Sequence, residues 1–219
     1  MLRIGIVDDH LLFRKSMTLL INSFDGMHVV IDAENGRQFL NQLQDTTIDV
    51  VLLDIQMPVM DGYETCKLLL NRFPDVKILI VSQLTSRESI HKIMELGAHG
   101  YFTKNTNPEQ LELAIRSMHE EGFYFGLELG SVIKEAMLWE NNNPVDVVNH
   151  KDLFSDRELQ IIRMICNEMK SKEIAEKLFI NIRTVESHRK HVMEKSNSKN
   201  FIGVILFALK NGILTIDEL

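Results

Sequence analysis

The stretch "IDVVLLD", residues 48–54, runs through four consecutive apolar residues and ends on a carboxylate. Successive side chains of a strand point to opposite faces, so this strand is apolar on both faces. Such strands are typical of the centre of a parallel sheet that helices cover on both sides. Parallel neighbours are joined through helices, so strands and helices should alternate on either side of this stretch.

Strand and helix patterns do alternate along the first half of the chain. The short apolar runs that predict further strands are residues 2–7, 29–33, 77–82 and 100–104. The segments with helical spacing of apolar residues are 10–24, 35–44, 61–73, 86–97 and 107–122. Residues 1–122 therefore predict an α/β domain with a doubly wound, five-stranded parallel sheet of the flavodoxin-like kind.

Five polar side chains stand where the predicted strands end: Asp8, Asp9, Asp54, Ser82 and Lys104. Each acid alone could simply cap a helix or start a turn. In a doubly wound sheet, however, the carboxyl ends of the strands share one edge, where ligands bind. Three carboxylates around one point need a cation, and hard oxygen ligands with room for water favour Mg²⁺. With Lys104 as a mobile positive charge, the set predicts phosphoryl transfer onto the Asp54 carboxylate.

Charge is distributed unevenly over the 219 residues, whose net charge is −7. Residues 1–122 carry 11 Lys and Arg against 17 Asp and Glu, whereas residues 151–212 carry 12 against 8. A basic segment attached to an acidic one indicates a polyanionic partner for the C-terminal part. No apolar stretch reaches the roughly 20 residues that span a bilayer. The two distant cysteines favour reduced thiols in a cytoplasmic protein.

The C-terminal part, residues 151–219, has helical patterns, and the preceding residues 123–150 predict a connecting helix and a flexible tether. "SDRE" at 155–158 predicts a capping box at a helix start. A short amphipathic helix, the tight turn "IN" at 180–181 and a longer helix with a polar face predict a helix-turn-helix. Its second helix would fit the major groove of DNA. The alternative from the pattern alone is a small helical bundle with a solvated basic face.

The motifs "IVDDH", "VLLDIQMPVMDG", "ILIVS" and "GAHGYFTK" resemble, in order and spacing, the receiver domain of bacterial response regulators. The resemblance covers residues 1–122 and implies that a partner histidine kinase phosphorylates Asp54. It also implies a switch pair, Ser82 and Tyr101, whose movement remodels the face of the domain around the fifth strand. The groups implied around Mg²⁺ and the phosphoryl group are Asp8, Asp9, Asp54, the backbone carbonyl of Gln56, and Lys104.

"SDRELQIIRMI", "KEIAEKLFINIRTVESHRKHVMEK" and "ALKNGI" resemble the LuxR-type DNA-binding domain of the NarL/FixJ response regulators, over nearly all of residues 152–214. The resemblance implies a four-helix domain that binds double-stranded DNA as a homodimer, with the helix at 182–195 as the recognition helix. The base-facing residues would be Glu186, Ser187 and Lys190. The residues that hold phosphates, and so position the protein without reading sequence, would be Lys172, Arg183, Thr184 and Arg189.

Together, the resemblances predict a regulator of transcription and not an enzyme. A Mg²⁺-dependent phosphatase tends to carry a second Asp two residues after its nucleophile, where this chain has Gln56. A phosphorylation-independent interaction module often lacks part of the acidic set, which is complete here. The departures from the family pattern are Gln83 after the switch hydroxyl, Asn105 after the lysine, Glu168 in place of a glycine, and "SNS" at 196–198 before the last helix.

Overall fold

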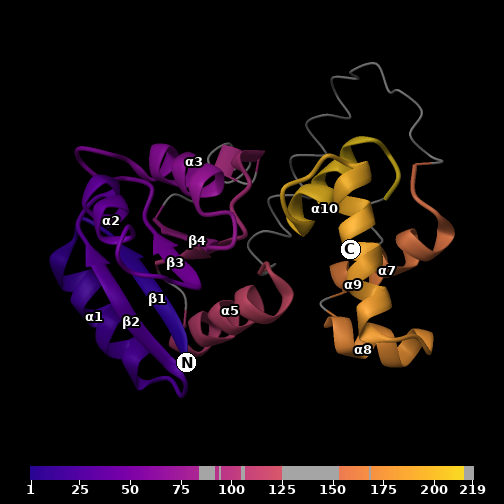
Figure 1. Ribbon diagram of the computed structural model, residues 1–219, viewed down its shortest axis with the longest axis horizontal. Coiled ribbons are helices and arrows are strands. Elements are labelled where there is room, and N and C mark those ends of the chain that lie inside the picture. The colour runs from indigo at the N-terminus through magenta and orange to yellow at the C-terminus, as the bar shows by residue number, and fades with distance from the viewer. Residues whose placement is uncertain (84–91, 94, 105–106, 125–152, 168, 215–219) are drawn as a thin grey trace. The chain divides into compact units, whose positions relative to one another are not determined.

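The computed structural model describes residues 1–83, 92–93, 95–104, 107–124, 153–167 and 169–214 (Figure 1). The chain divides into two compact units, residues 1–126 and 127–219. The connecting helix and tether predicted for residues 123–150 fall almost wholly outside the described residues. So do Asn105, Glu168 and most of the helix predicted at 86–97.

The N-terminal unit is built on five parallel strands in the order β2-β1-β3-β4-β5, which confirms the predicted doubly wound sheet. The strands are β1 (Leu2–Val7), β2 (Met27–Ala33), β3 (Val50–Leu53), β4 (Lys77–Ser82) and β5 (Gly100–Thr103). Strand β3 lies at the centre, between β1 and β4, and all its residues are buried. The continuous apolar stretch thus marks the middle of the sheet.

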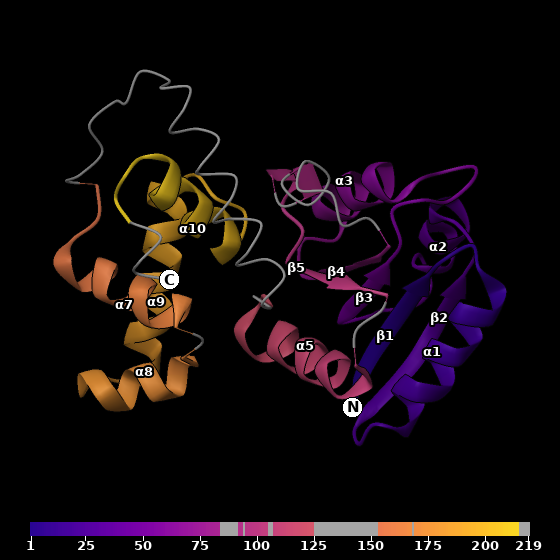
Figure 2. The same ribbon diagram turned by 180° about the vertical axis from the view of Figure 1, so that it is seen from behind.

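Helices cover both faces of this sheet (Figures 1 and 2). They are α1 (Leu11–Ser23), α2 (Gly36–Gln42), α3 (Gly62–Arg72) and α5 (Pro108–Glu121). Helices α1 and α5 share one face, where their apolar side chains form one core cluster with β1, β3, β4 and β5. Helices α2 and α3 lie on the opposite face. As predicted, α5 begins at a proline and ends before Gly122, whose left-handed φ of 81° suits a residue without a Cβ.

His99, directly before β5, is a buried polar residue of the sheet. Its Nδ1 accepts a hydrogen bond from the backbone N–H of Ile78 at 3.2 Å. Its own backbone N–H donates to the Ile78 carbonyl at 2.9 Å. Burial, helped by the charge of nearby Lys77, lowers the pKa of His99 to about 3. The folded state therefore holds this imidazole neutral, because a proton on Nδ1 would remove the acceptor for Ile78.

We expect His99 to make the free energy of unfolding fall as the solution is acidified. The pKa of His99 is about 6.5 in the unfolded chain and about 3 in the folded protein. Between these values the unfolded state binds the extra proton, so about 2 kcal/mol of stability is lost from pH 7 to pH 5. His99→Asn keeps an acceptor near Nδ1 without a titratable group, so urea unfolding of this variant should lack that loss. The same pH dependence in both proteins would contradict the assignment.

The C-terminal unit contains α7 (Asp156–Cys166), α8 (Ser171–Leu178), α9 (Ile182–Lys195) and α10 (Phe201–Lys210). The predicted capping box is confirmed: the Ser155 N–H donates to Glu158 Oε2 at 2.8 Å, and the Glu158 N–H donates to Ser155 Oγ at 3.3 Å. Lys195, at the end of α9, lies 2.7 Å from the same carboxylate and ties α9 to the start of α7. Across the described parts of the chain, no helix is both long and apolar enough to cross a membrane.

A three-residue turn separates α8 from α9. Phe179 ends α8 in the left-handed conformation, with φ 53° and its side chain almost fully exposed. Asn181 caps α9, because its side chain accepts a hydrogen bond from the Arg183 N–H at 2.9 Å. The short helix, the turn and the longer helix therefore form the predicted helix-turn-helix.

Candidate functional site

The ends of β1 and β3 bring two carboxylates to one edge of the sheet. Asp8 directly follows β1 and Asp54 directly follows β3, and both are buried. Backbone hydrogen bonds fix the two positions: the Asp54 N–H donates to the Val7 carbonyl at 2.9 Å, and the Asp8 N–H donates to the Ala33 carbonyl at 3.1 Å. The sheet itself therefore sets the separation of the two acids.

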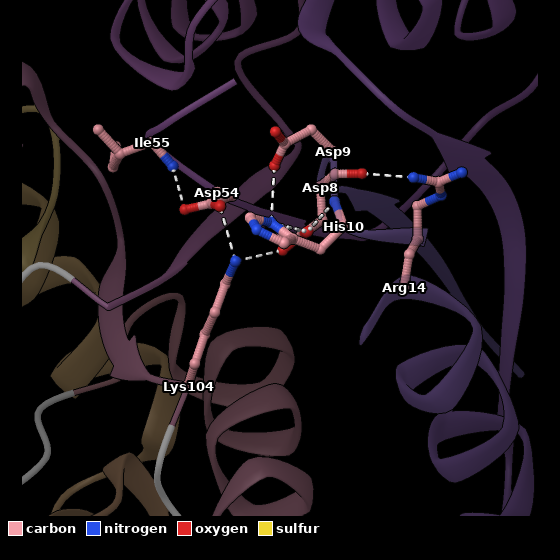
Figure 3. A network of polar contacts seen from close by, with 7 residues as sticks. All are labelled: Asp8, Asp9, His10, Arg14, Asp54, Ile55 and Lys104. Atoms are coloured by element: carbon pink, nitrogen blue, oxygen red, sulfur yellow. Dashed lines mark hydrogen bonds and ion pairs between the residues drawn. The ribbon is translucent and has the colours of Figure 1, made fainter. Parts of the chain in front are cut away.

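Lys104, directly after β5, joins these two acids (Figure 3). Its Nζ lies 2.6 Å from Asp54 Oδ2 and 2.6 Å from Asp8 Oδ2, and it stands over the Phe13 ring at 4.7 Å from the centroid. Burial by itself lowers the pKa of Lys104, but the hydrogen bonds to Asp54 and Asp8 outweigh burial and raise that pKa. Lys104 therefore stays protonated and places a positive charge beside Asp54, the predicted phosphoacceptor.

A cation could be held beside this lysine. Ligand atoms of Asp8, Asp9, His10 and Asp54 lie within 4.8 Å of one another. Carboxylate oxygens at this spacing suit a hard divalent cation. An open pocket of about 560 Å³ leaves room for water beside them, and its lining is Asp9, Ile55, Gln56, Met57, Asp61 and Tyr63. The structure thus brings the predicted metal-binding acids together and places Gln56 on the wall of the same pocket.

His10 is a member of this cluster that the sequence did not single out. Its Nδ1 lies 2.8 Å from Asp9 Oδ1, and its backbone N–H donates to Asp8 Oδ1 at 2.8 Å (Figure 3). The imidazole is largely exposed, so it orients Asp9 from the solvent side.

The predicted switch residues are both buried. Ser82 is the last residue of β4, and the carbonyl of Ser82 accepts a hydrogen bond from the Lys104 N–H at 3.1 Å. Tyr101 lies on β5, on the face opposite to α1 and α5, because the adjacent Phe102 belongs to the cluster that those helices cover. Gln83, next to Ser82, is exposed.

The polar face predicted for the recognition helix is present on α9, with one exception. Val185 and Val192 of α9 are buried. The exposed residues among those predicted to contact DNA are Lys172 of α8 and Arg183, Thr184, Glu186, Ser187 and Lys190 of α9. These six side chains therefore lie at the surface of the domain.

Arg189 is the exception, and the prediction that it lies outside is wrong. It is 5% exposed. Its guanidinium donates to Ser171 Oγ at 2.6 Å, lies 3.2 Å from Glu186 Oε1, and stands over the Phe201 ring. Arg189 follows Val185 by four residues and precedes Val192 by three, so helical spacing places it on the buried stripe. A guanidinium with these partners holds α8, α9 and α10 together instead of reaching a phosphate.

Arg14 is a further residue that the sequence interpretation missed. It is buried, and it contacts Asp32 of β2 as well as the Asp8 carbonyl; Figure 3 shows the contact with Asp8. Helical spacing places Arg14 on the same stripe of α1 as Ile21, which is buried. This spacing is the feature of the sequence from which the burial of Arg14 could have been predicted. Its partners lie 6 and 18 residues away along the chain, and no sequence pattern pairs them.

Fold and sites together define a class of protein: an α/β domain with an acidic, lysine-bridged edge, joined in one chain to a helix-turn-helix domain. Comparison with known families agrees with this class. Residues 4–116 match the response regulator receiver domain, and residues 152–208 match the bacterial regulatory proteins of the luxR family.

The similarity to known proteins extends over nearly the full length of the chain. The chain is 33% identical over 215 residues to the oxygen regulatory protein NreC of Staphylococcus aureus, covering 97% of this chain and 99% of NreC. The solved response regulator ChrA of a heme-sensing two-component system is 26% identical, with a TM-score of 0.51 over 97% of this chain and 98% of ChrA. RcsB in complex with DNA shares the fold, at 20% identity and a TM-score of 0.58, over 98% of this chain and 99% of RcsB.

The chain belongs to the NarL/FixJ-type response regulators of two-component systems, which combine a receiver domain with a LuxR-type DNA-binding domain. It is therefore a regulator of transcription, from a family whose receiver domain implies a histidine kinase as partner.

Proposed function

We propose that a partner histidine kinase transfers a phosphoryl group to Asp54, which changes dimerisation and the binding of specific double-stranded DNA. The observation that carries the proposal is the Lys104 ammonium, 2.6 Å from carboxylates of both Asp8 and Asp54. A lysine held there can pair with a phosphoryl oxygen on Asp54 after only a small movement. The ammonium then neutralises charge that develops during transfer.

In this proposal Mg²⁺ would be held by Asp8, Asp9, Asp54 and the backbone carbonyl of Gln56. It would neutralise negative charge on the phosphoryl oxygens. The protein's own groups orient the nucleophile: the Ile55 N–H donates to Asp54 Oδ1 at 2.7 Å, so one carboxylate oxygen is fixed. The Ser82 hydroxyl donates to a phosphoryl oxygen, and Tyr101 follows it as the second member of the switch pair.

The C-terminal domain reads DNA through α9 in the major groove. The residues that face base edges are Glu186, Ser187 and Lys190. The residues that hold phosphates are Lys172, Arg183 and Thr184; buried Arg189 no longer belongs to this group. A related fold supports a dimer on DNA, since a solved structure of RcsB contains two dimers bound to two parallel DNAs.

The following experiment tests whether phosphorylation of the receiver domain changes DNA binding. The protein is first treated with acetyl phosphate and Mg²⁺, and a duplex that it binds is then selected from a pool of random sequences. Phosphorylated protein should bind the selected duplex about tenfold more tightly than untreated protein, a usual size for coupling between sites. Equal affinity of the two forms would contradict the proposed switch.

We propose that two copies meet through exposed leucines on helices α1 and α5. Leu12 and Leu19 of α1 are 82% and 75% exposed, and Leu113 of α5 is 52% exposed. The two helices are neighbours on the same face of the sheet, because Arg116 of α5 donates to the Asp25 carbonyl just after α1 at 2.9 Å. Apolar side chains gathered on two adjacent helices favour an isologous contact with a second copy.

We expect Leu12→Glu combined with Leu19→Glu to abolish dimerisation of the phosphorylated chain, because two carboxylates would face their copies across the two-fold axis. Labelling of Asp54 should persist, since neither leucine lines the acidic site. Sedimentation velocity with acetyl phosphate present measures the mass. Val59→Glu changes an equally exposed apolar residue elsewhere and should leave the dimer intact. Dimers in the double variant would exclude this surface.

The lifetime of the phosphorylated state should depend on Gln83, which is exposed beside buried Ser82. Hydrolysis needs a water in line with the bond that breaks, and we propose that the long Gln83 side chain, next to Ser82 in the sequence, obstructs that approach. Gln83→Ala should therefore lose phosphate about tenfold faster, near 1.4 kcal/mol of barrier. The measurement follows the label after the phosphodonor is removed with Mg²⁺ present. An unchanged or slower rate would mean that Gln83 does not control the water.

A further inference from the structure

Arg14 is a buried cation beside the acidic site that no step of the proposed chemistry uses. Its side chain is 9% exposed, although arginine is almost never buried unless it is paired. It lies in the first turn of α1, the helix that directly follows the acids. Its partners explain the burial and connect it to the acidic site.

Two contacts tie Arg14 to the ends of β1 and β2 at once, and Figure 3 shows the one with Asp8. Its NH1 donates to the backbone carbonyl of Asp8 at 2.5 Å, and its Nε donates to the carboxylate of Asp32. Asp32 is the second-last residue of β2, and the next residue, Ala33, accepts the Asp8 N–H. The end of β1, the end of β2 and the start of α1 are therefore locked around one guanidinium.

The carbonyl that Arg14 holds belongs to the peptide between Asp8 and Asp9. A peptide unit is planar, so fixing its oxygen fixes the direction in which the chain enters Asp9. Asp9 is the more exposed of the two acids, with 31% of its side chain accessible. Its position therefore depends on how firmly the backbone before it is held.

The positive charge of Arg14 is balanced by Asp32, a carboxylate that lies outside the acidic cluster. Asp32 pairs with Arg14 and also with Lys15, whose Nζ lies 2.5 Å from Oδ2. Burial raises the pKa of Asp32, but its bonds to Lys15 and Arg14 outweigh burial and lower it, so the carboxylate stays charged. Lys15 is 59% exposed and pairs with the same Asp32 carboxylate, so it offers a control for the charge of this pair.

We propose that Arg14 is a positioning residue for the divalent cation: held by Asp32, it fixes the Asp8–Asp9 peptide so that both carboxylates converge with that of Asp54. This inference rests on the proposed Mg²⁺ site. Residues that orient metal ligands in this way typically change metal affinity 10–100-fold when replaced. Lysine cannot reproduce the arginine's two divergent hydrogen bonds.

The test is calorimetric titration of the full chain with MgCl₂ in wild type, Arg14→Lys and Lys15→Ala. We expect Arg14→Lys to raise the Mg²⁺ dissociation constant about tenfold or more, and Lys15→Ala to stay within about twofold. Labelling by acetyl phosphate should then need more Mg²⁺ in Arg14→Lys but reach the wild-type rate at saturation. A purely structural role would lower the unfolding temperature without changing Mg²⁺ affinity.

An unchanged dissociation constant in folded Arg14→Lys overturns the inference. If that variant fails to fold, the same titration of Asp32→Asn tests the inference. This substitution leaves Arg14 in place but removes the carboxylate charge that compensates it, and should weaken Mg²⁺ binding severalfold; unchanged binding in this variant also overturns the inference. A wild type that binds no Mg²⁺ and takes no label would instead mean that the proposed function itself is wrong.

Discussion

Asp54→Asn should take up no label from acetyl phosphate and Mg²⁺, whereas the wild-type chain should be labelled. An amide oxygen is a poor nucleophile, and the replacement also removes one of the two carboxylate charges that hold Lys104. Asp54 is the candidate because it lies at the carboxyl end of the central strand, and its buried carboxylate is 2.6 Å from the Lys104 Nζ. Autoradiography of denatured protein measures the incorporation.

Asp61→Asn provides a matched control for this experiment. Asp61 lines the same pocket, but its carboxylate caps α3 by accepting the Glu64 N–H at 2.8 Å. Asparagine is an equally good cap, so the helix should be retained. This variant should be labelled as the wild type is. Equal labelling of Asp54→Asn and wild type, after non-specific modification is excluded, would mean that another residue is the nucleophile.

Lys190→Ala should cost about 1–3 kcal/mol of binding at a selected DNA site and relax specificity at one base position. Its side chain is 74% exposed, and its nearest acid, Glu194, is 3.8 Å away. Such an exposed pair contributes little to stability, so the thermal unfolding of the variant should match that of the wild type. Fluorescence anisotropy with the selected duplex and single-base variants of it measures both effects.

Arg183→Ala and Arg189→Ala separate phosphate contacts from the packing of α9. Arg183 is exposed near the start of α9, so its loss should weaken all DNA sequences about equally and lower the salt slope by roughly 1. Arg189→Ala leaves buried Ser171 without this donor, so we expect it to destabilise the domain by about 2 kcal/mol. If Lys190→Ala and Arg183→Ala both bind DNA as the wild type does, α9 does not enter the groove.

Much of the fold was predictable because it follows from local periodicity. Residues 50–53 are apolar on both faces of the strand, which is typical of the centre of a helix-covered parallel sheet. Parallel topology then places the strand ends at one edge, so Asp8, Asp54 and Lys104 could be grouped without coordinates. The capping box at Ser155 was equally predictable, since its two hydrogen bonds lie within one turn of helix.

The sequence interpretation placed Arg189 on the exposed face of its helix, whereas the residue is buried, and the reason is physical. Spacing in α9 puts Arg189 on the stripe of Val185 and Val192, but its charge argued for the outside. A charged side chain can be buried when it is paired, and Arg189 pairs with Ser171 and Phe201 on two other helices as well as with Glu186 on its own helix. The sequence pattern carries no record of such pairings.

Sequence alone therefore determined the class of fold, the residues that end its strands and the helix-turn-helix of the C-terminal domain, because each depends on repeats of two or 3.6 residues and on known topology. Only the tertiary structure decided that Lys104 bridges Asp8 and Asp54, that Arg14 holds the Asp8 carbonyl and that Arg189 is buried. Those facts are contacts between side chains or backbone groups on different elements, and their geometry depends on how the elements pack.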